Sequence, residues 1–172
     1  MPVPEQKNNR KGFKIRYVYY GAWYSWDADR LKRNKILIAA ACVLGLVFFL
    51  LGNCTGANAN RSAFVGIPAN LSIAVFVFEV LGVIQFCAAK EKVTKPDYQD
   101  INIKLRAATL IRAFMLLVAG IGCIITTIVN RLAWNELLSA LGYLLSALCS
   151  VFIYVHYKRI PFHTEKNQQT LG

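Results

Sequence analysis

Two ionisable residues interrupt long apolar stretches of this sequence, where charged chemistry is unusual. Glu79 precedes the next basic residue, Lys90, by eleven positions, which at ~1.5 Å per residue is roughly 16 Å along a helix. Arg112 follows Arg106 by six positions, just inside the next apolar stretch. Because a charged side chain is costly in lipid, residues of this kind are rarely kept there without a partner or a role.

The short connector between the two stretches predicts that Glu79 and Arg112 lie in the same half of adjacent antiparallel helices. The two side chains would then be within reach of each other. Three interpretations follow: a buried pair that fixes helix register, a proton or cation site on a transport path, or a contact with a charge on a partner's helix.

The rest of the sequence offers few groups for catalysis. It contains no H-E-x-x-H, G-x-S-x-G, Walker A or G-x-G-x-x-G pattern. The five cysteines include no C-x-x-C pair, and the two histidines, His156 and His163, have no cysteine or carboxylate at metal-ligand spacing. We therefore expect no enzyme activity, no cofactor and no metal site.

The composition requires a lipid environment for the elements that carry Glu79 and Arg112. Of the 172 residues, 56% are hydrophobic and only 17% are charged, which is too apolar for an ordinary soluble domain of this length. A bilayer core about 30 Å thick needs roughly 20 apolar residues per helix. Four apolar stretches approach or exceed that length, and we predict transmembrane helices at about 36–52, 63–89, 107–129 and 132–155.

The basic residues between these stretches predict an orientation. Nine Lys and Arg residues lie in the N-terminal segment 1–35, five in the connector 90–106 and three in the tail 156–172, whereas the other two links hold only Arg61 and Arg131. Because cytoplasmic loops are enriched in Lys and Arg, we expect an up-down four-helix bundle with both termini in the cytoplasm. The net charge of +11 then reflects topology and attraction to an anionic inner leaflet, with no need for nucleic acid as a partner.

An aromatic segment precedes the first apolar stretch. Residues 13–26 read FKIRYVYYGAWYSW, and their aromatic positions fit either a helix or a strand. Aromatic rings beside basic residues suit the lipid headgroup layer. We expect an interfacial anchor, or alternatively a docking surface for a partner, formed by Tyr17, Tyr20, Trp23, Tyr24 and Trp26.

Small residues mark two predicted helix-packing seams. The first apolar stretch holds Ala41 and Gly45 four positions apart, and the last holds Gly142, Ser146 and Ser150 at the same spacing. Such spacing lets helix backbones approach closely in a membrane. We expect these seams to pack helices together and to offer contacts to partner helices.

The plan of a basic N-terminal segment, four spans, short outer links and a basic tail resembles that of MARVEL-type tetraspan membrane proteins. This resemblance covers the architecture of the whole chain and no individual residue. We expect a small non-enzymatic membrane scaffold or accessory subunit that binds lipid and a membrane protein partner, or a homo-oligomer. The alternative is an oligomeric transporter or channel subunit in which Glu79 and Arg112 form the polar site, and a membrane enzyme acting on lipid substrates is a third possibility.

Overall fold

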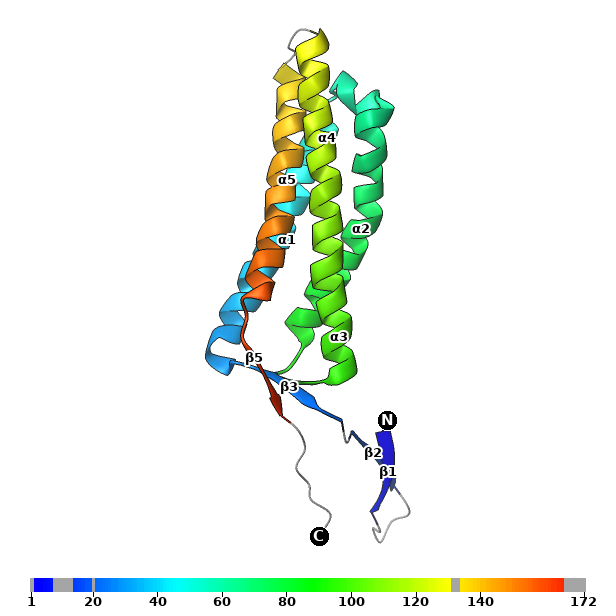
Figure 1. Ribbon diagram of the computed structural model, residues 1–172, viewed down its shortest axis with the longest axis vertical. Helices are drawn as coiled ribbons and strands as arrows, with labels where there is room; N and C mark the ends of the chain where they lie inside the picture. Colours follow the sequence, from blue (N-terminus) through cyan, green and yellow to red (C-terminus); the bar gives the residue numbers. More distant parts are fainter. Residues whose placement is uncertain (1, 8–13, 20, 131–133, 166–172) are drawn as a thin grey trace.

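The computed structural model describes residues 2–7, 14–19, 21–130 and 134–165, and it is dominated by long helices (Figure 1). These are α1 (Ala28–Cys54), α2 (Ala63–Ala88), α4 (Thr109–Asn130) and α5 (Trp134–Lys158). The short helix α3 (Lys95–Ile103) and a π-helical turn, η2 (Lys104–Ala108), continue directly into α4. The prediction of four helices that are long and apolar enough to cross a membrane is confirmed.

Three of the helices extend beyond the predicted apolar stretches, whereas α2 matches its stretch closely. The first apolar stretch begins at 36, but a possible N-cap at Ser25 or Asp27 predicts a helix start near Ala28, and α1 does begin there. The third helix begins at Lys95 rather than 107, and the last ends at Lys158 rather than 155. An apolar run marks only the part of a helix that suits lipid, whereas good helix formers such as Lys and Arg continue the helix into a polar environment. The predicted start of the last helix, at 132–133, lies outside the described residues.

Successive helices alternate in direction, as Figure 1 shows, but they do not all pack on their neighbours in sequence. The most extensive contacts join α5 to α1 and to α4, followed by those between α4 and α2, whereas α1 and α2 contact each other much less. The expected contact between consecutive helices is therefore present but weakest for the first pair. Bulky core side chains of these two helices, such as Ile38 and Phe86, fill the space around them, whereas glycine allows α5 to approach α1 closely.

A small antiparallel sheet closes one end of the bundle. The alternation in residues 13–26 allowed a strand there, but nothing in the sequence predicted the two strands that pair with it. It consists of β3 (Trp23–Trp26), β4 (Lys92–Thr94) and β5 (Phe162–Glu165), in the order β4-β3-β5 (Figure 1). The sheet joins the N-terminal segment, the α2–α3 connector and the C-terminal tail. These are the three segments whose basic residues predicted a common side. Separately, β1 (Pro2–Lys7) and β2 (Lys14–Tyr19) form an antiparallel hairpin.

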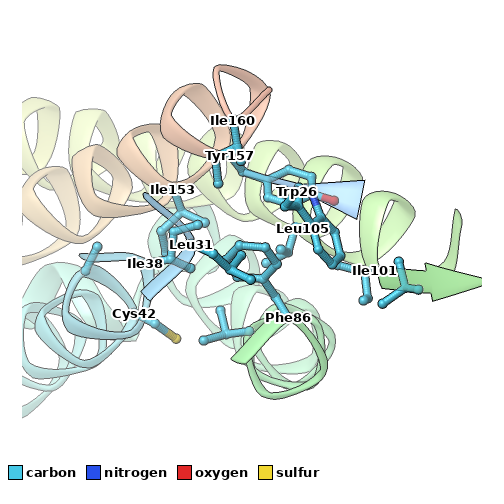
Figure 2. Packing of buried hydrophobic residues seen from close by; sticks show 13 residues of the cluster. Trp26, Leu31, Ile38, Cys42, Phe86, Ile101, Leu105, Ile153, Tyr157 and Ile160 are labelled. Carbon is cyan, nitrogen blue, oxygen red and sulfur yellow. The ribbon is translucent and has the colours of Figure 1, made fainter. Parts of the chain in front are cut away.

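The sheet is fastened to the helices by aromatic side chains. Trp26 is only 4% exposed and meets Phe86 edge-on at 5.5 Å, and Phe86 meets Tyr157 in the same way at 5.5 Å (Figure 2). Tyr24 stacks on Tyr98 of α3 with 4.4 Å between the ring centroids. The aromatic segment thus helps to form a hydrophobic core beneath the sheet.

These contacts place one residue of the predicted interfacial anchor in the protein core. Because side chains alternate along a strand, Tyr24 and Trp26 share the face of β3 that packs on the helices, and Trp26 is buried there. The anchoring role of the segment stays a prediction. Trp23 is partly exposed at the start of β3. Tyr17 lies in β2, opposite Pro4, and Tyr20 lies outside the described residues.

Candidate functional site

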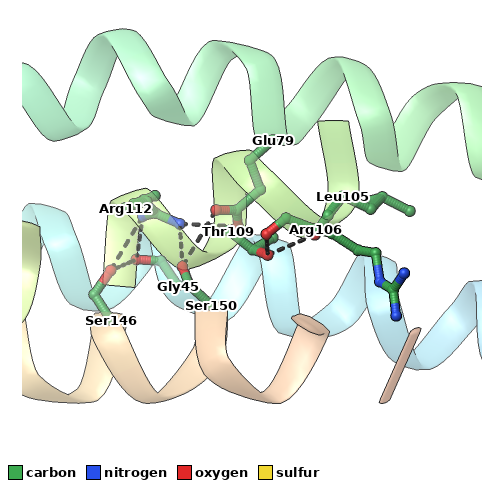
Figure 3. A network of polar contacts seen from close by, with 8 residues as sticks. All are labelled: Gly45, Glu79, Leu105, Arg106, Thr109, Arg112, Ser146 and Ser150. Carbon is green, nitrogen blue, oxygen red and sulfur yellow. Dashed lines mark hydrogen bonds and ion pairs between the residues drawn. The ribbon is translucent and has the colours of Figure 1, made fainter. Parts of the chain in front are cut away.

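Glu79 of α2 and Arg112 of α4 meet in the interior of the bundle (Figure 3). Arg112 Nη1 lies 3.0 Å from Glu79 Oε1, which makes this a hydrogen-bonded ion pair. Both are buried: Glu79 is 0% exposed and Arg112 is 1% exposed. The structure therefore brings together the two residues that the sequence singled out.

Serines of α5 and a glycine of α1 complete the surroundings of the pair. Arg112 donates through Nη1 to Ser150 Oγ at 3.1 Å and through Nη2 to Ser146 Oγ at 3.1 Å and to the Gly45 carbonyl at 3.4 Å. Ser150 Oγ in turn donates to Glu79 Oε2 at 3.2 Å, and Ser146 Oγ donates to the Gly45 carbonyl at 2.7 Å. All four long helices thus contribute to one hydrogen-bonded network. Both predicted seams supply members of it: Gly45 from the first, and Ser146 and Ser150 from the second.

The small residues and one aromatic ring explain how the guanidinium fits. A Cβ on Gly45 would lie 3.2 Å from Cys149 Cβ and 3.5 Å from Arg112 Nη1, so glycine lets α5 and the guanidinium approach α1 closely at this point. The ring of Phe76, one turn before Glu79, lies 4.1 Å from Arg112 Cζ in a cation–π contact. Arg112 Nε is buried and has no hydrogen-bond partner among the described residues.

The π-helical turn η2 positions Arg112, and no signal in the sequence identified it. A π turn inserts one residue into a helix and so rotates the face presented by the residues that follow. Gly82, one turn after Glu79, packs against this turn: a Cβ there would lie 2.9 Å from Lys104 Cβ and 3.3 Å from the Leu105 side chain. This close approach brings α2 near enough to the α3–α4 helix for Glu79 to reach Arg112.

The remaining seam residues hold α1 against α5. A Cβ on Gly142 would lie 2.5 Å from Gly52 N and 2.6 Å from Gly52 Cα, so the two helix backbones are in direct contact. Ala41 is also buried in the core. All five predicted seam residues are therefore buried inside the bundle, where they pack its own helices together. That they also contact partner helices stays a prediction.

A second polar network lies nearer the opposite end of the bundle. Glu136 of α5 is 8% exposed and accepts hydrogen bonds from the backbone N–H of Asn58 at 2.8 Å and of Ala59 at 3.2 Å, which begin the short 3-10 helix η1 (Asn58–Arg61). A carboxylate at the N-terminus of a helical turn is electrostatically favourable. Glu136 therefore holds the link between α1 and α2 in place.

The same link also satisfies the C-terminal end of α1. The Gly52 carbonyl accepts hydrogen bonds from Ser139 Oγ at 2.6 Å and from Asn60 Nδ2 at 3.1 Å. Tyr143 OH donates to Asn60 Oδ1 at 3.1 Å. The Gly52 carbonyl at the end of α1 and the side chains of Ser139, Asn60 and Tyr143 are thus hydrogen-bonded to one another.

Replacing Glu136 with glutamine is expected to lower the free energy of unfolding by about 1 kcal/mol, because a neutral acceptor replaces a charged one at the start of η1. Thermal unfolding in detergent micelles measures this change. The exposed neighbour Asn135, replaced with alanine, serves as the control and should leave stability unchanged. Equal stability of the glutamine variant and the wild type would show that the charge of Glu136 is unimportant.

The geometry favours a structural use of the central pair. Both charges are enclosed, and each has hydrogen-bond partners within the bundle. Among the described residues, no three His, Cys, Asp or Glu side chains gather closely enough to hold a metal ion. The network is suited to fixing the relative positions of four helices.

Comparisons with protein-family models, with curated proteins and with solved structures found no match to this chain.

Proposed function

We propose that this chain is a multi-pass integral membrane protein with both termini in the cytoplasm, acting as a small scaffold or accessory subunit for a partner membrane protein. The observation that carries the proposal is the enclosed Glu79–Arg112 network, whose charges are paired with groups of the same chain. A residue pair used in this way stabilises the bundle and leaves function to the outer surface.

The distribution of surface side chains supports this proposal. Large apolar residues are exposed along all four long helices, among them Leu50, Ile84, Phe114 and Leu148. Because the small-residue seams are buried, a partner's transmembrane helices would contact these outward faces. The seventeen basic residues that the sequence analysis assigns to the cytoplasm belong to the three segments that contribute strands to the three-stranded sheet.

Extraction of the tagged chain from its native membrane in a gentle detergent, followed by mass spectrometry, tests the scaffold role. We expect recovery of a larger membrane protein in stoichiometric amount. The matched control is an unrelated four-span protein with the same tag and expression level, which should not recover that partner. Recovery of the chain alone, as a discrete homo-oligomer, would contradict the accessory role.

A small transporter or channel subunit is the second candidate, and one observation favours it. The buried Arg112 Nε has no described partner, so the network has an unused donor at the centre of the bundle. In proteoliposomes, a carrier that uses this site would lose ion or proton flux on replacement of Glu79 by glutamine while remaining folded. Equal flux in the wild type, the variant and protein-free liposomes would exclude this function for the ions tested.

A further inference from the structure

The end of the bundle that carries the sheet contains a basic cleft between α1 and the turn that follows α2. Its volume is about 640 Å³, and it is lined by Leu31, Lys32, Lys35, Ala89, Lys90 and Lys92. Glu91 is the one acidic residue among the lining residues. The volume falls in the range of roughly 300–1,000 Å³ typical of small-ligand sites, and the lysines give the cleft a strongly positive potential.

The structure keeps some of these lysines in place and leaves others available. Lys35 Nζ donates a hydrogen bond to the Ala89 carbonyl, which ties α1 to the end of α2. Lys32 and Lys90 are exposed and make no hydrogen bond or ion pair with any of the described residues. The ammonium groups of Lys32 and Lys90 are therefore available to a ligand, while Lys35 holds the two walls of the cleft together.

The cleft lies where the helix surfaces change from apolar to charged. Ile36 is 60% exposed and directly follows Lys35, and Ile84 of α2 is 57% exposed six positions before Lys90. In a membrane, the phosphate groups of lipids lie at this level. Basic pockets between transmembrane helices on the cytoplasmic side are suited to anionic headgroups.

We propose that this cleft binds the phosphate of an anionic membrane lipid, with Lys32 and Lys90 as the principal contacts. The apolar Leu31 and Ala89 would border the headgroup, and the acyl chains would lie along the exposed apolar surface that begins beside the cleft. This inference rests on the membrane placement proposed above but does not depend on the scaffold role.

The test is lipid retention by the full chain in nanodiscs of phosphatidylcholine containing increasing amounts of phosphatidic acid, read by native mass spectrometry. The double variant Lys32→Gln/Lys90→Gln should bind phosphatidic acid on the order of 30-fold more weakly than the wild type, because about fivefold is expected per lysine near the surface. The charge-conserving variant Lys32→Arg/Lys90→Arg should retain binding.

A matched control separates the cleft from general surface charge. Arg30 and Arg33 are exposed on the same helix but do not line the cleft, so Arg30→Gln/Arg33→Gln removes the same charge at nearly the same depth. We expect this control to lose distinctly less affinity for phosphatidic acid than the cleft variant, because its two side chains do not line the cleft that would hold the headgroup. An equal loss in the two glutamine variants, or no loss in either, would overturn the proposal.

A second arm distinguishes a lipid from a soluble anion. Inorganic phosphate added to phosphatidylcholine nanodiscs should not protect the cleft lysines from amine-reactive labelling at concentrations at which phosphatidic acid does. Equal protection by inorganic phosphate would assign the cleft to a soluble ligand and reject the lipid. Because these measurements use the isolated chain, a negative result leaves the partner-recovery experiment unaffected.

Discussion

Replacing Arg112 with leucine is expected to destabilise the bundle by about 3–5 kcal/mol, because it leaves the carboxylate of Glu79 buried without its counter-charge. The change also removes the donors that reach Ser146, Ser150 and the Gly45 carbonyl. Equilibrium unfolding in mixed micelles, with increasing dodecyl sulfate, measures the loss. The exposed Arg30, replaced with leucine, controls for removal of a positive charge and should change stability little.

The double variant Glu79→Gln/Arg112→Leu distinguishes a direct pair from two independent residues. If the charges stabilise each other, removing both should cost less than the sum of the single changes, with a coupling energy of roughly 0.5–3 kcal/mol. Additive losses would mean that Glu79 and Arg112 do not act as a pair. Such a result would also remove the main support for a purely structural role of the network.

Replacing Gly142 with valine is expected to cost about 3 kcal/mol or more, because its Cβ alone would lie 2.5 Å from the backbone nitrogen of Gly52. The contact involves the backbones of both helices, so α1 and α5 must separate. That separation would also stretch the hydrogen bonds from α5 to the Gly45 and Gly52 carbonyls. The same unfolding assay measures the loss.

A substitution at the adjacent position provides the control for Gly142. Leu141 is 47% exposed, and its replacement with valine changes a side chain on the outer surface of the same helix turn. We expect a loss well below that of the glycine variant, within about 0.5 kcal/mol. A Gly142→Val protein as stable as the control would mean that the close approach of α1 and α5 is not required.

The sequence by itself determined the number of long helices and identified two charged residues, Glu79 and Arg112, that lie within them. Long apolar runs with few charged residues are a direct physical requirement of a lipid-exposed helix, so the four helices could be predicted without knowledge of how they pack. The same reasoning made Glu79 and Arg112 conspicuous, since a charge inside an apolar run needs compensation. Small residues at four-residue spacing indicated close packing, although not which helix would occupy each seam.

Tertiary structure alone decided how these elements meet. Whether Gly142 faces α1 or a partner protein depends on how α5 is rotated about its own axis. The spacing of small residues shows that they share one face of the helix but not which neighbour that face meets. In the third helix, the π turn before Arg112 changes the rotation of the residues that follow it, and Gly82 of α2 packs closely against this turn. The sheet of β3, β4 and β5 could not be foreseen because its strands are short and far apart in the chain. Their pairing becomes favourable only after the four helices have brought the three segments to one end, where Trp26 then enters the core.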